Sequence, residues 1–153
     1  LYEMNLVMDK SKLLNIVRNK LLEKIQKFEK LIEETRASNS DTKSSMGDKY
    51  ETGREMLQQE INNLQRQLNE ALNQQAFLQK VNTESSAKVQ NGALVETEKG
   101  LFYIAASVGE VICDNRKVMT VSAESPLAKA MAGLTAGQSF SLNNTSHTVK
   151  QIW

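Results

Sequence analysis

Two acidic residues three positions apart, Asp48 and Glu51, are the strongest candidates for chemistry in this chain. They lie in the stretch "SSMGDKYETGRE", Ser44 to Glu55. If a helix begins at or before Asp48, both carboxylates project from the same side of its first turn. Paired carboxylates suit Mg²⁺, which is commonly held by one or two carboxylates together with waters and substrate phosphates. Acidic residues also stabilise the first turn of any helix by complementing its dipole, and spacing alone favours that structural role.

Other side chains around this pair could contact a partner. Lys43, Lys49 and Arg54 flank the acids and could bind phosphate groups, although lysines near helix ends are common on any protein surface. Met46 is an apolar side chain at a turn and could touch a partner, whereas Met56 is expected in a helix core. The expected contact residues of the turn are Met46, Gly47, Lys49, Tyr50 and Arg54.

Two amphipathic stretches must position this turn. From about residue 9 to 36, and again from about 50 to 80, apolar residues recur at steps of three and four, which predicts two helices. The stripes are Leu14, Val17, Leu21, Ile25, Phe28 and Ile32, then Leu57, Ile61, Leu64, Leu68, Ala71 and Leu78. Two such stripes joined by a Ser- and Asn-rich loop bury each other most simply as an antiparallel coiled-coil hairpin. We expect helices over about 9–38 and 48–80, with the tip at about 39–50.

The second half of the chain has a different pattern. Short apolar or alternating segments separated by turn residues predict about five strands, over residues 89–95, 101–106, 118–121, 140–142 and 148–152. The segment "SPLAKAMAGL" predicts a short helix, with Ser125 as N-cap, Pro126 in the first helical position and Gly133 as a stop signal. The sequence therefore predicts an α+β protein, with a coiled-coil hairpin over residues 1–84 and a small α+β domain over 85–153.

Composition narrows the classes of function. Lys and Arg total 19 against 18 Asp and Glu, so no charge excess indicates nucleic-acid or membrane binding. Cys113 is the only cysteine, which excludes an internal disulfide, and it is expected as a small buried hydrophobe. His147, the only histidine, lies in a polar, turn-like stretch. No apolar run approaches the roughly 20 residues that span a bilayer, and no signal-peptide pattern is present, so a cytoplasmic protein is expected.

Three segments carry a resemblance to the bacterial transcript-cleavage factors of the Gre family. "GDKYE", residues 47–51, is similar to the family's G-D-x-x-E sequence at the tip of a coiled coil. "SPLAKAMAGLTAGQSFSL", residues 125–142, resembles the family's S-P-(I/L)-(A/G)-(K/R) turn into a short helix and the strand that follows. "ALVETEKGLFYIAASVGE", residues 93–110, resembles the hairpin that opens the family's C-terminal domain.

The resemblance implies a bacterial transcription elongation factor with an FKBP-like C-terminal domain. Such a factor docks on RNA polymerase near the secondary channel, here through Ser125, Pro126 and Leu127, while its hairpin enters the channel. Asp48 and Glu51 would then help to position a Mg²⁺ ion shared with the polymerase, which cleaves backtracked RNA. The factor itself would be no enzyme, would hold no cofactor of its own, would contact nascent RNA indirectly and would be a monomer.

Two other functions fit the same segments. The family's usual continuation after the motif is replaced here by "TGREMLQQ", so the protein could occupy the channel and regulate the polymerase without promoting cleavage. Alternatively, the hairpin is a coiled-coil dimerisation element of a structural adaptor, and the turn then tolerates substitution. Prolyl isomerase activity is not expected, because aromatic residues make up only 5% of the chain and such sites need an aromatic-lined pocket.

Overall fold

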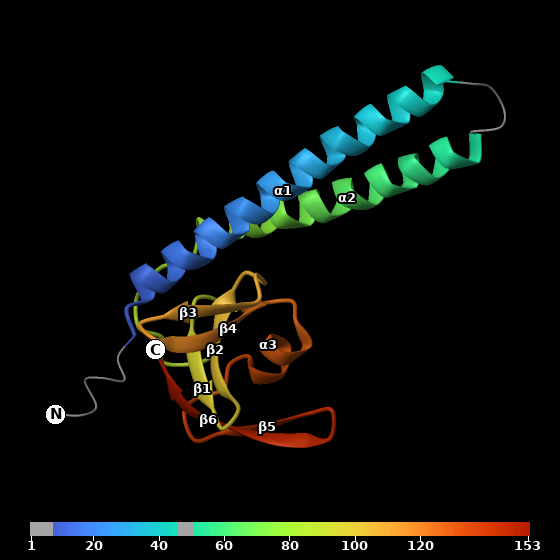
Figure 1. Ribbon diagram of the computed structural model, residues 1–153. Coiled ribbons are helices and arrows are strands. Elements are labelled where there is room, and N and C mark those ends of the chain that lie inside the picture. Colours follow the sequence, from blue (N-terminus) through green and yellow to red (C-terminus); the bar gives the residue numbers. More distant parts are fainter. Residues whose placement is uncertain (1–7, 46–50) are drawn as a thin grey trace. The chain divides into compact units, whose positions relative to one another are not determined.

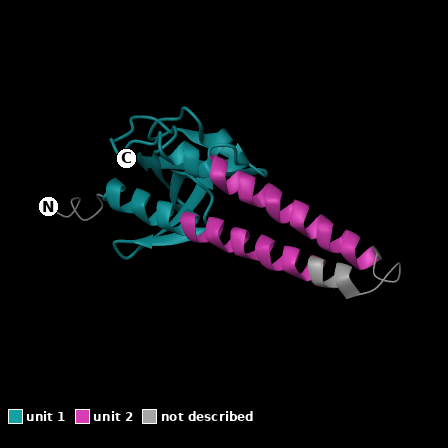
Figure 2. Ribbon diagram, turned by 90° about the horizontal axis from the view of Figure 1, so that it is seen from above, with its two compact units in different colours: residues 1–21, 74–153 teal, residues 22–73 magenta. Residues whose placement is uncertain are grey.

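The computed structural model describes residues 8–45 and 51–153, with the backbone alone described for residues 40–45 and 51 (Figure 1). The described chain forms two compact units, one of residues 1–21 with 74–153 and the other of residues 22–73 (Figure 2). Two long helices precede a six-stranded mixed sheet, which confirms the predicted α+β class. The predicted domain boundary near residue 84 stays a prediction.

The unit of residues 22–73 is a pair of helices lying side by side, formed from parts of α1 (Lys10–Ser45) and α2 (Glu51–Leu78). Its buried residues follow the predicted stripes and are Ile25, Ile32, Ile61, Leu64, Leu68 and Ala71. Burial of one Leu or Ile side chain contributes about 1.5–3 kcal/mol, so this seam holds the pair together. Charged residues cover the outward faces, as expected for an amphipathic hairpin.

The helix ends differ from those predicted. Asp9 caps α1, since its Oδ1 accepts from the backbone N–H groups of Ser11 and Lys12 at 3.0 and 3.2 Å. The helix then continues to Ser45, past the predicted end near residue 38. Helix α2 (Glu51–Leu78) ends two residues before the predicted end at 80, and its predicted start at 48 lies outside the described residues. The Ser- and Asn-rich stretch after residue 36 contains neither Gly nor Pro, so nothing in it breaks the helix.

The sheet has the strand order β3-β4-β2-β1-β6-β5. Its strands are β1 (Leu94–Thr97), β2 (Gly100–Ala105), β3 (Glu110–Cys113), β4 (Arg116–Ser122), β5 (Ser139–Leu142) and β6 (Thr145–Ile152). All pairs are antiparallel except β2 with β4. The sheet therefore contains one strand, β3, that was not predicted. It is a short edge strand with alternating burial, but its exposed position 112 holds an isoleucine, 63% exposed, so polar and apolar residues do not alternate along it.

The first predicted strand also begins later than expected. Val89 lies before β1, where its N–H donates to Leu134 O and its carbonyl accepts from Gly133 N, both at 2.8 Å. Val89 is buried by this pairing with the segment that follows the short helix α3 (Pro126–Met131). Val89 is therefore part of the hydrophobic core although it does not belong to a strand of the sheet.

Each face of the sheet carries buried residues within the unit of residues 1–21 and 74–153. On one face, Ala128 and Met131 of α3 pack with Val95, Ile104 and Val149. On the other, Leu101, Val118 and Val111 lie side by side across three strands and are buried. The first turns of α1 belong to the same unit and bury Leu13, Leu14, Val17 and Leu21. Among the described residues, no helix combines the length and apolar character that a membrane span requires.

Replacement of Gly92 by alanine is expected to destabilise the protein. Gly92 has φ +85°, and an added Cβ would lie 3.1 Å from Val81 Cγ1 and 3.4 Å from Asn82 O. The strained backbone and these contacts predict a loss of about 1–3 kcal/mol in the free energy of unfolding, measured by urea denaturation.

Gly53→Ala is the matched control, because Gly53 lies in α2 and an added Cβ meets nothing within 4 Å. This change should raise stability by up to about 1 kcal/mol. Equal effects of the two substitutions would contradict the conformational role of Gly92.

Candidate functional site

The turn between the two long helices holds the predicted site. Helix α1 is described to Ser45 and α2 from Glu51, so the motif "GDKYE" falls between the two described helices except for its last residue, Glu51, which belongs to α2. Residues 46–50, which include Met46, Gly47, Asp48, Lys49 and Tyr50, lie outside the described part of the chain. The predicted metal-positioning role of Asp48 and Glu51 stays a prediction, as does their placement on one helical turn.

The start of α2 shows how the segment after the motif is placed. Glu51 is the first described residue of α2, and Arg54 follows about one turn later with a half-buried side chain. Met56 is 65% exposed, so its predicted place in the helix core is wrong. It precedes Leu57 of the apolar stripe by one residue, and a step of one residue turns the side chain about 100° away from the stripe. Arg54 and Met56 therefore extend the candidate site along the first turns of α2.

The residues predicted to dock on the polymerase form the beginning of α3. Ser125 Oγ accepts from Ala128 N at 3.1 Å and donates to Ser122 O at 2.8 Å, as an N-cap residue does. Pro126 takes the first helical position and is exposed, while Leu127 packs in part against the core of the unit. The predicted helix and its cap are confirmed, and docking through these three residues stays a prediction.

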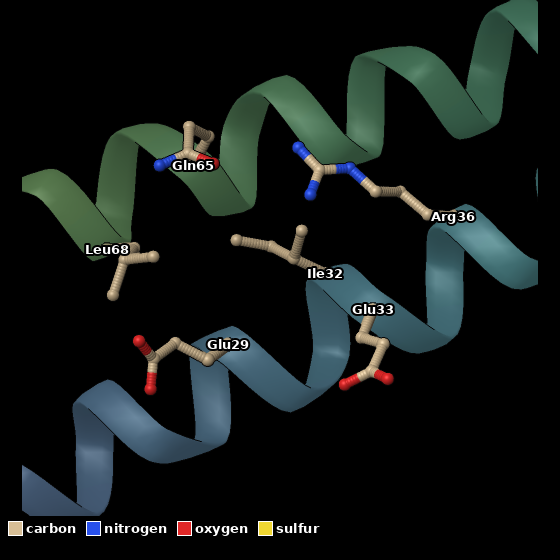
Figure 3. Close-up of a pocket in the computed structure, with 6 residues that line it drawn as sticks. All are labelled: Glu29, Ile32, Glu33, Arg36, Gln65 and Leu68. Carbon is tan, nitrogen blue, oxygen red and sulfur yellow. The ribbon is translucent and has the colours of Figure 1, made fainter.

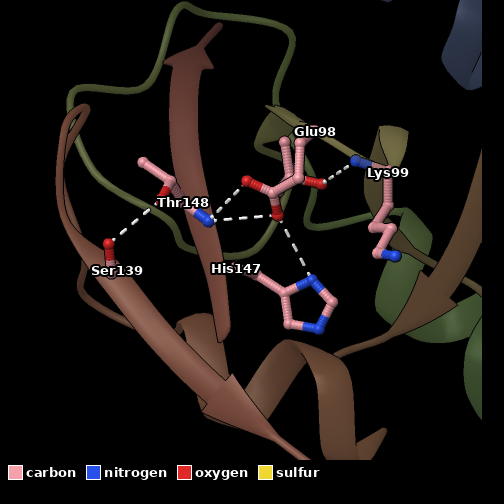
Figure 4. A network of polar contacts seen from close by, with 6 residues as sticks. Glu98, Lys99, Ser139, His147 and Thr148 are labelled. Atoms are coloured by element: carbon pink, nitrogen blue, oxygen red, sulfur yellow. Dashed lines mark hydrogen bonds and ion pairs between the residues drawn. The ribbon is translucent and has the colours of Figure 1, made fainter. Parts of the chain in front are cut away.

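A polar cluster that sequence reasoning missed joins the β1–β2 turn to β6 (Figure 4). Glu98 accepts from Thr148 N through both carboxylate oxygens, at 2.9 and 3.1 Å, and its Oε1 lies 3.3 Å from His147 Nδ1. The His147 ring stacks on Phe140 with ring centroids 5.0 Å apart. The Thr148 N–H, with a smaller effect of His147, lowers the pKa of Glu98 below its ordinary value of 4.5.

The polar neighbours of His147 in the sequence suggested a turn, but His147 lies on strand β6. Glu98 and His147 are far apart in the sequence, and no local pattern links a glutamate in one hairpin to a histidine in another. The cluster joins the β1–β2 hairpin to the β5–β6 hairpin and so has a structural role, and we name it the Glu98 clasp. Among the side chains that the structure describes, no three His, Cys, Asp or Glu residues gather as a metal site.

A second set of polar contacts fastens the first turn of α1. Lys10 is only 6% exposed, and its ammonium donates to Glu84 O at 2.7 Å and to Trp153 O at 3.1 Å. Burial lowers the pKa of Lys10. Lys12 Nζ lies 2.7 Å from Asp114 Oδ1 in an exposed ion pair, which is worth little by itself. These contacts fix helix and sheet within one unit.

Tyr103 is the largest fully buried side chain of that unit. Burial raises its pKa to about 12, so the phenol stays protonated at neutral pH. Its hydroxyl has no hydrogen-bond partner within the described residues. The predicted burial of Cys113, in the edge strand β3, is confirmed, and burial raises the pKa of its thiol. Neither group is therefore placed as a nucleophile.

Comparisons with known proteins give only distant structural matches. The chain is similar to the transcription factor Gfh1, at 17% identity and a TM-score of 0.38 over 88% of this chain and 92% of that chain. GreA factor homolog 1 (Gfh1) of Thermus thermophilus matches at 18% identity and a TM-score of 0.38 over 89% and 94% of the two chains. Gfh1 of Thermus aquaticus matches at 17% identity and a TM-score of 0.36 over 88% and 92%. At these values the matches do not establish the family of this chain. No family model and no curated protein matches the sequence.

The Glu98 clasp predicts a pH-dependent contribution to stability. A carboxylate whose pKa is lower in the folded than in the unfolded chain stabilises the fold above the unfolded pKa, and the gain is lost as pH falls through the folded pKa. Glu98→Gln should therefore lower stability at neutral pH, and the difference from the wild type should shrink towards zero below the ordinary value of 4.5. Urea denaturation at several pH values measures this difference.

Glu124→Gln is a suitable control, because Glu124 has an 87% exposed side chain and only a long contact of 3.7 Å with Lys129. It should have little effect at any pH. A Glu98→Gln effect that is independent of pH would show that the charge of Glu98 is not what stabilises the clasp.

Proposed function

We propose that this protein is a Gre-like elongation factor that binds RNA polymerase and promotes cleavage of backtracked RNA. The observation that carries the proposal is the position of "GDKYE" between two long paired helices. A G-D-x-x-E match alone is weak, since it fixes only three positions. Its place at the end of a helical hairpin, in a chain that continues into a small sheet domain, is what the resemblance requires.

The hairpin supplies reach and stiffness. Helix α1 has 36 residues and α2 has 28, and a rise of about 1.5 Å per residue gives lengths of about 54 and 42 Å. The buried seam of the residues 22–73 keeps the two helices paired. Such an element can carry a few charged side chains into a narrow channel without needing the body of an enzyme around them.

The chemistry then depends on the acids of the turn. In two-metal hydrolysis of a phosphodiester, the metal ions stabilise the attacking and the leaving oxygen atoms. Asp48 and Glu51 would hold the position of one Mg²⁺ that the polymerase shares, and two carboxylates alone fill only part of its octahedral shell. Lys43, Lys49 and Arg54 would contact phosphate groups nearby.

The sheet domain would provide the surface that docks on the polymerase. Pro126 is exposed and Leu127 partly so, and the Ser125 cap holds both in a fixed backbone conformation. This rigidity suits a surface that must orient a long hairpin. The alternative of a factor that occupies the channel without promoting cleavage rests on Gly53 and the segment around it, which replace the family's usual continuation.

Cleavage of RNA in a stalled, backtracked polymerase tests the proposal. The wild-type protein should stimulate cleavage, and an Asp48→Asn, Glu51→Gln double variant should lose about 10-fold or more of the stimulation, because the metal position is no longer held. Glu60→Gln is the matched control, since Glu60 is an exposed acid on α2 outside the turn. It should keep full stimulation.

Binding of each variant to the polymerase is measured alongside cleavage. Equal stimulation by the wild type and the double variant would remove Asp48 and Glu51 from the site. Binding with suppression of cleavage would establish the non-cleaving regulator instead, and failure of the wild type to bind would overturn the proposed function.

A further inference from the structure

The pair Asn91–Gly92 lies in the turn that leads into strand β1. It is the one place in the chain where an asparagine precedes a glycine. Asn91 is exposed, whereas Gly92 is buried and has φ +85°. Asparagine is a chemically labile residue, and a following glycine has no side chain to hinder an approach to its backbone nitrogen. The pair therefore has the composition of a site at which the chain can modify itself.

The reaction needs only the chain and water. The backbone nitrogen of Gly92 loses its proton to solvent and attacks the side-chain carbon Cγ of Asn91. A C–N bond forms, the side-chain nitrogen takes up a proton and leaves as ammonia, and a five-membered succinimide ring remains. Water then opens the ring at either of its carbonyl groups, so that residue 91 becomes aspartate or isoaspartate. No atom is oxidised or reduced.

The folded chain withholds the nucleophile of this reaction. The Gly92 N–H donates to Ile104 O at 2.7 Å, and the Ile104 N–H donates to Ala93 O at 3.0 Å. The turn itself is closed by a hydrogen bond from Ala93 N to Gln90 O at 3.0 Å. A buried N–H that is engaged in this way does not lose its proton to solvent until the hydrogen bond opens.

Opening of these hydrogen bonds exposes the core of the unit that contains the sheet. Ala93 and Leu94 are 0% exposed, and Ile104 is 2% exposed. Leu94 also exchanges two backbone hydrogen bonds with Trp153, at 2.8 and 3.1 Å. Separation of the start of β1 from its neighbours thus has a free energy closer to that of global unfolding than to that of a fraying loop.

We propose that Asn91–Gly92 is a self-modification site that folding protects, so that deamidation there marks chains that have unfolded. The exposed turn gives the amide group of Asn91 access to water, and the Gly92–Ile104 hydrogen bond keeps the nucleophile engaged in the native state. The rate of deamidation then follows the fraction of chains in which β1 is open. The reaction is independent of the proposed polymerase function.

The two products have different consequences for the fold. The Asn91 side chain is exposed, so an aspartate at this position is compatible with the native structure. Isoaspartate instead adds one carbon atom to the main chain between Val89 and Ala93. Val89 is fixed by hydrogen bonds of 2.8 Å with Gly133 and Leu134, and Ala93 is fixed in the pairing with β2. An isoaspartate chain cannot regain both sets of contacts, so the modification makes unfolding permanent.

Deamidation of the full chain at mildly alkaline pH tests the proposal. Mass spectrometry of proteolytic peptides measures the conversion of amide to acid at residue 91 in the native chain, in the chain unfolded by guanidinium chloride, and in the synthetic peptide "KVQNGALV", residues 88–95. The unfolded chain and the peptide should react at similar rates. The native chain should react at least about 10-fold more slowly, because the reaction waits for a rare opening.

A core variant tests the coupling to unfolding. Val149 is 0% exposed and packs in the same core as Ile104, so Val149→Ala should speed deamidation of the native chain about 5- to 30-fold. Ile112→Ala is the control, because Ile112 is an apolar residue of the same sheet that is 63% exposed, and it should leave the rate unchanged. Guanidinium chloride below the unfolding transition should raise the wild-type rate in parallel with the unfolded fraction, which requires no variant.

Four outcomes would overturn the proposal. The first is an equal rate in the native chain and the peptide, which would show that the Gly92 hydrogen bond gives no protection. The second is a native rate that dilute denaturant does not change, and the third is faster conversion at another asparagine of the unfolded chain. The fourth is recovery of the native fold by isoaspartate chains after the denaturant is removed. No polymerase takes part, so failure of this proposal and failure of the proposed function are distinguishable.

Discussion

The burial of one apolar stripe of α1 against one of α2 is the interaction on which the rest of the structure depends. Each stripe repeats at three and four residues, and neither helix can cover its own stripe. Pairing the helices satisfies both at once and brings Ser45 and Glu51 to the two sides of one short connection. The motif "GDKYE" is placed by this constraint, whatever the conformation of the connection itself.

The same helices have a second role at their other ends. Residues 10–21 of α1 bury their apolar face in the unit that contains the sheet, and the Lys10 ammonium donates to two backbone carbonyls of the same unit. Gln74 Oε1 near the end of α2 accepts from Ser107 N at 2.7 Å. The first turns of α1 and the last turn of α2 therefore belong to the same compact unit as the sheet.

The sequence predicts the helices and the fold class because apolar periodicity is a local property. The end of α1 is predicted too early, because the serine and asparagine residues after position 36 favour a loop. No Gly or Pro interrupts the helix there, and it continues to Ser45. The sequence places Met56 in the core because a single step along a helix is hard to resolve from spacing. Strand β3 escapes prediction because Ile112 faces solvent at the edge of the sheet.

The polar contacts could not be predicted, for a different reason. Glu98 with His147, and Lys10 with Trp153, join segments whose approach is set by the sheet topology and not by any local pattern. The pocket that Ile32 and Leu68 line (Figure 3) likewise depends on which faces of the two helices meet, which the stripes alone do not specify. For the turn, by contrast, the sequence is the source of the prediction, since the motif alone identifies Asp48 and Glu51 as candidates.

Photo-crosslinking within a complex with backtracked RNA polymerase tests the central claim most directly. A photoreactive residue placed at Tyr50, in the turn, is compared with one placed at Glu124, an exposed position just before α3. The account predicts that the probe at position 50 crosslinks to the active-site region or to the 3′ end of the RNA, while the probe at position 124 crosslinks only to the polymerase surface. A complex that forms without any crosslink from position 50 to the active site would contradict it.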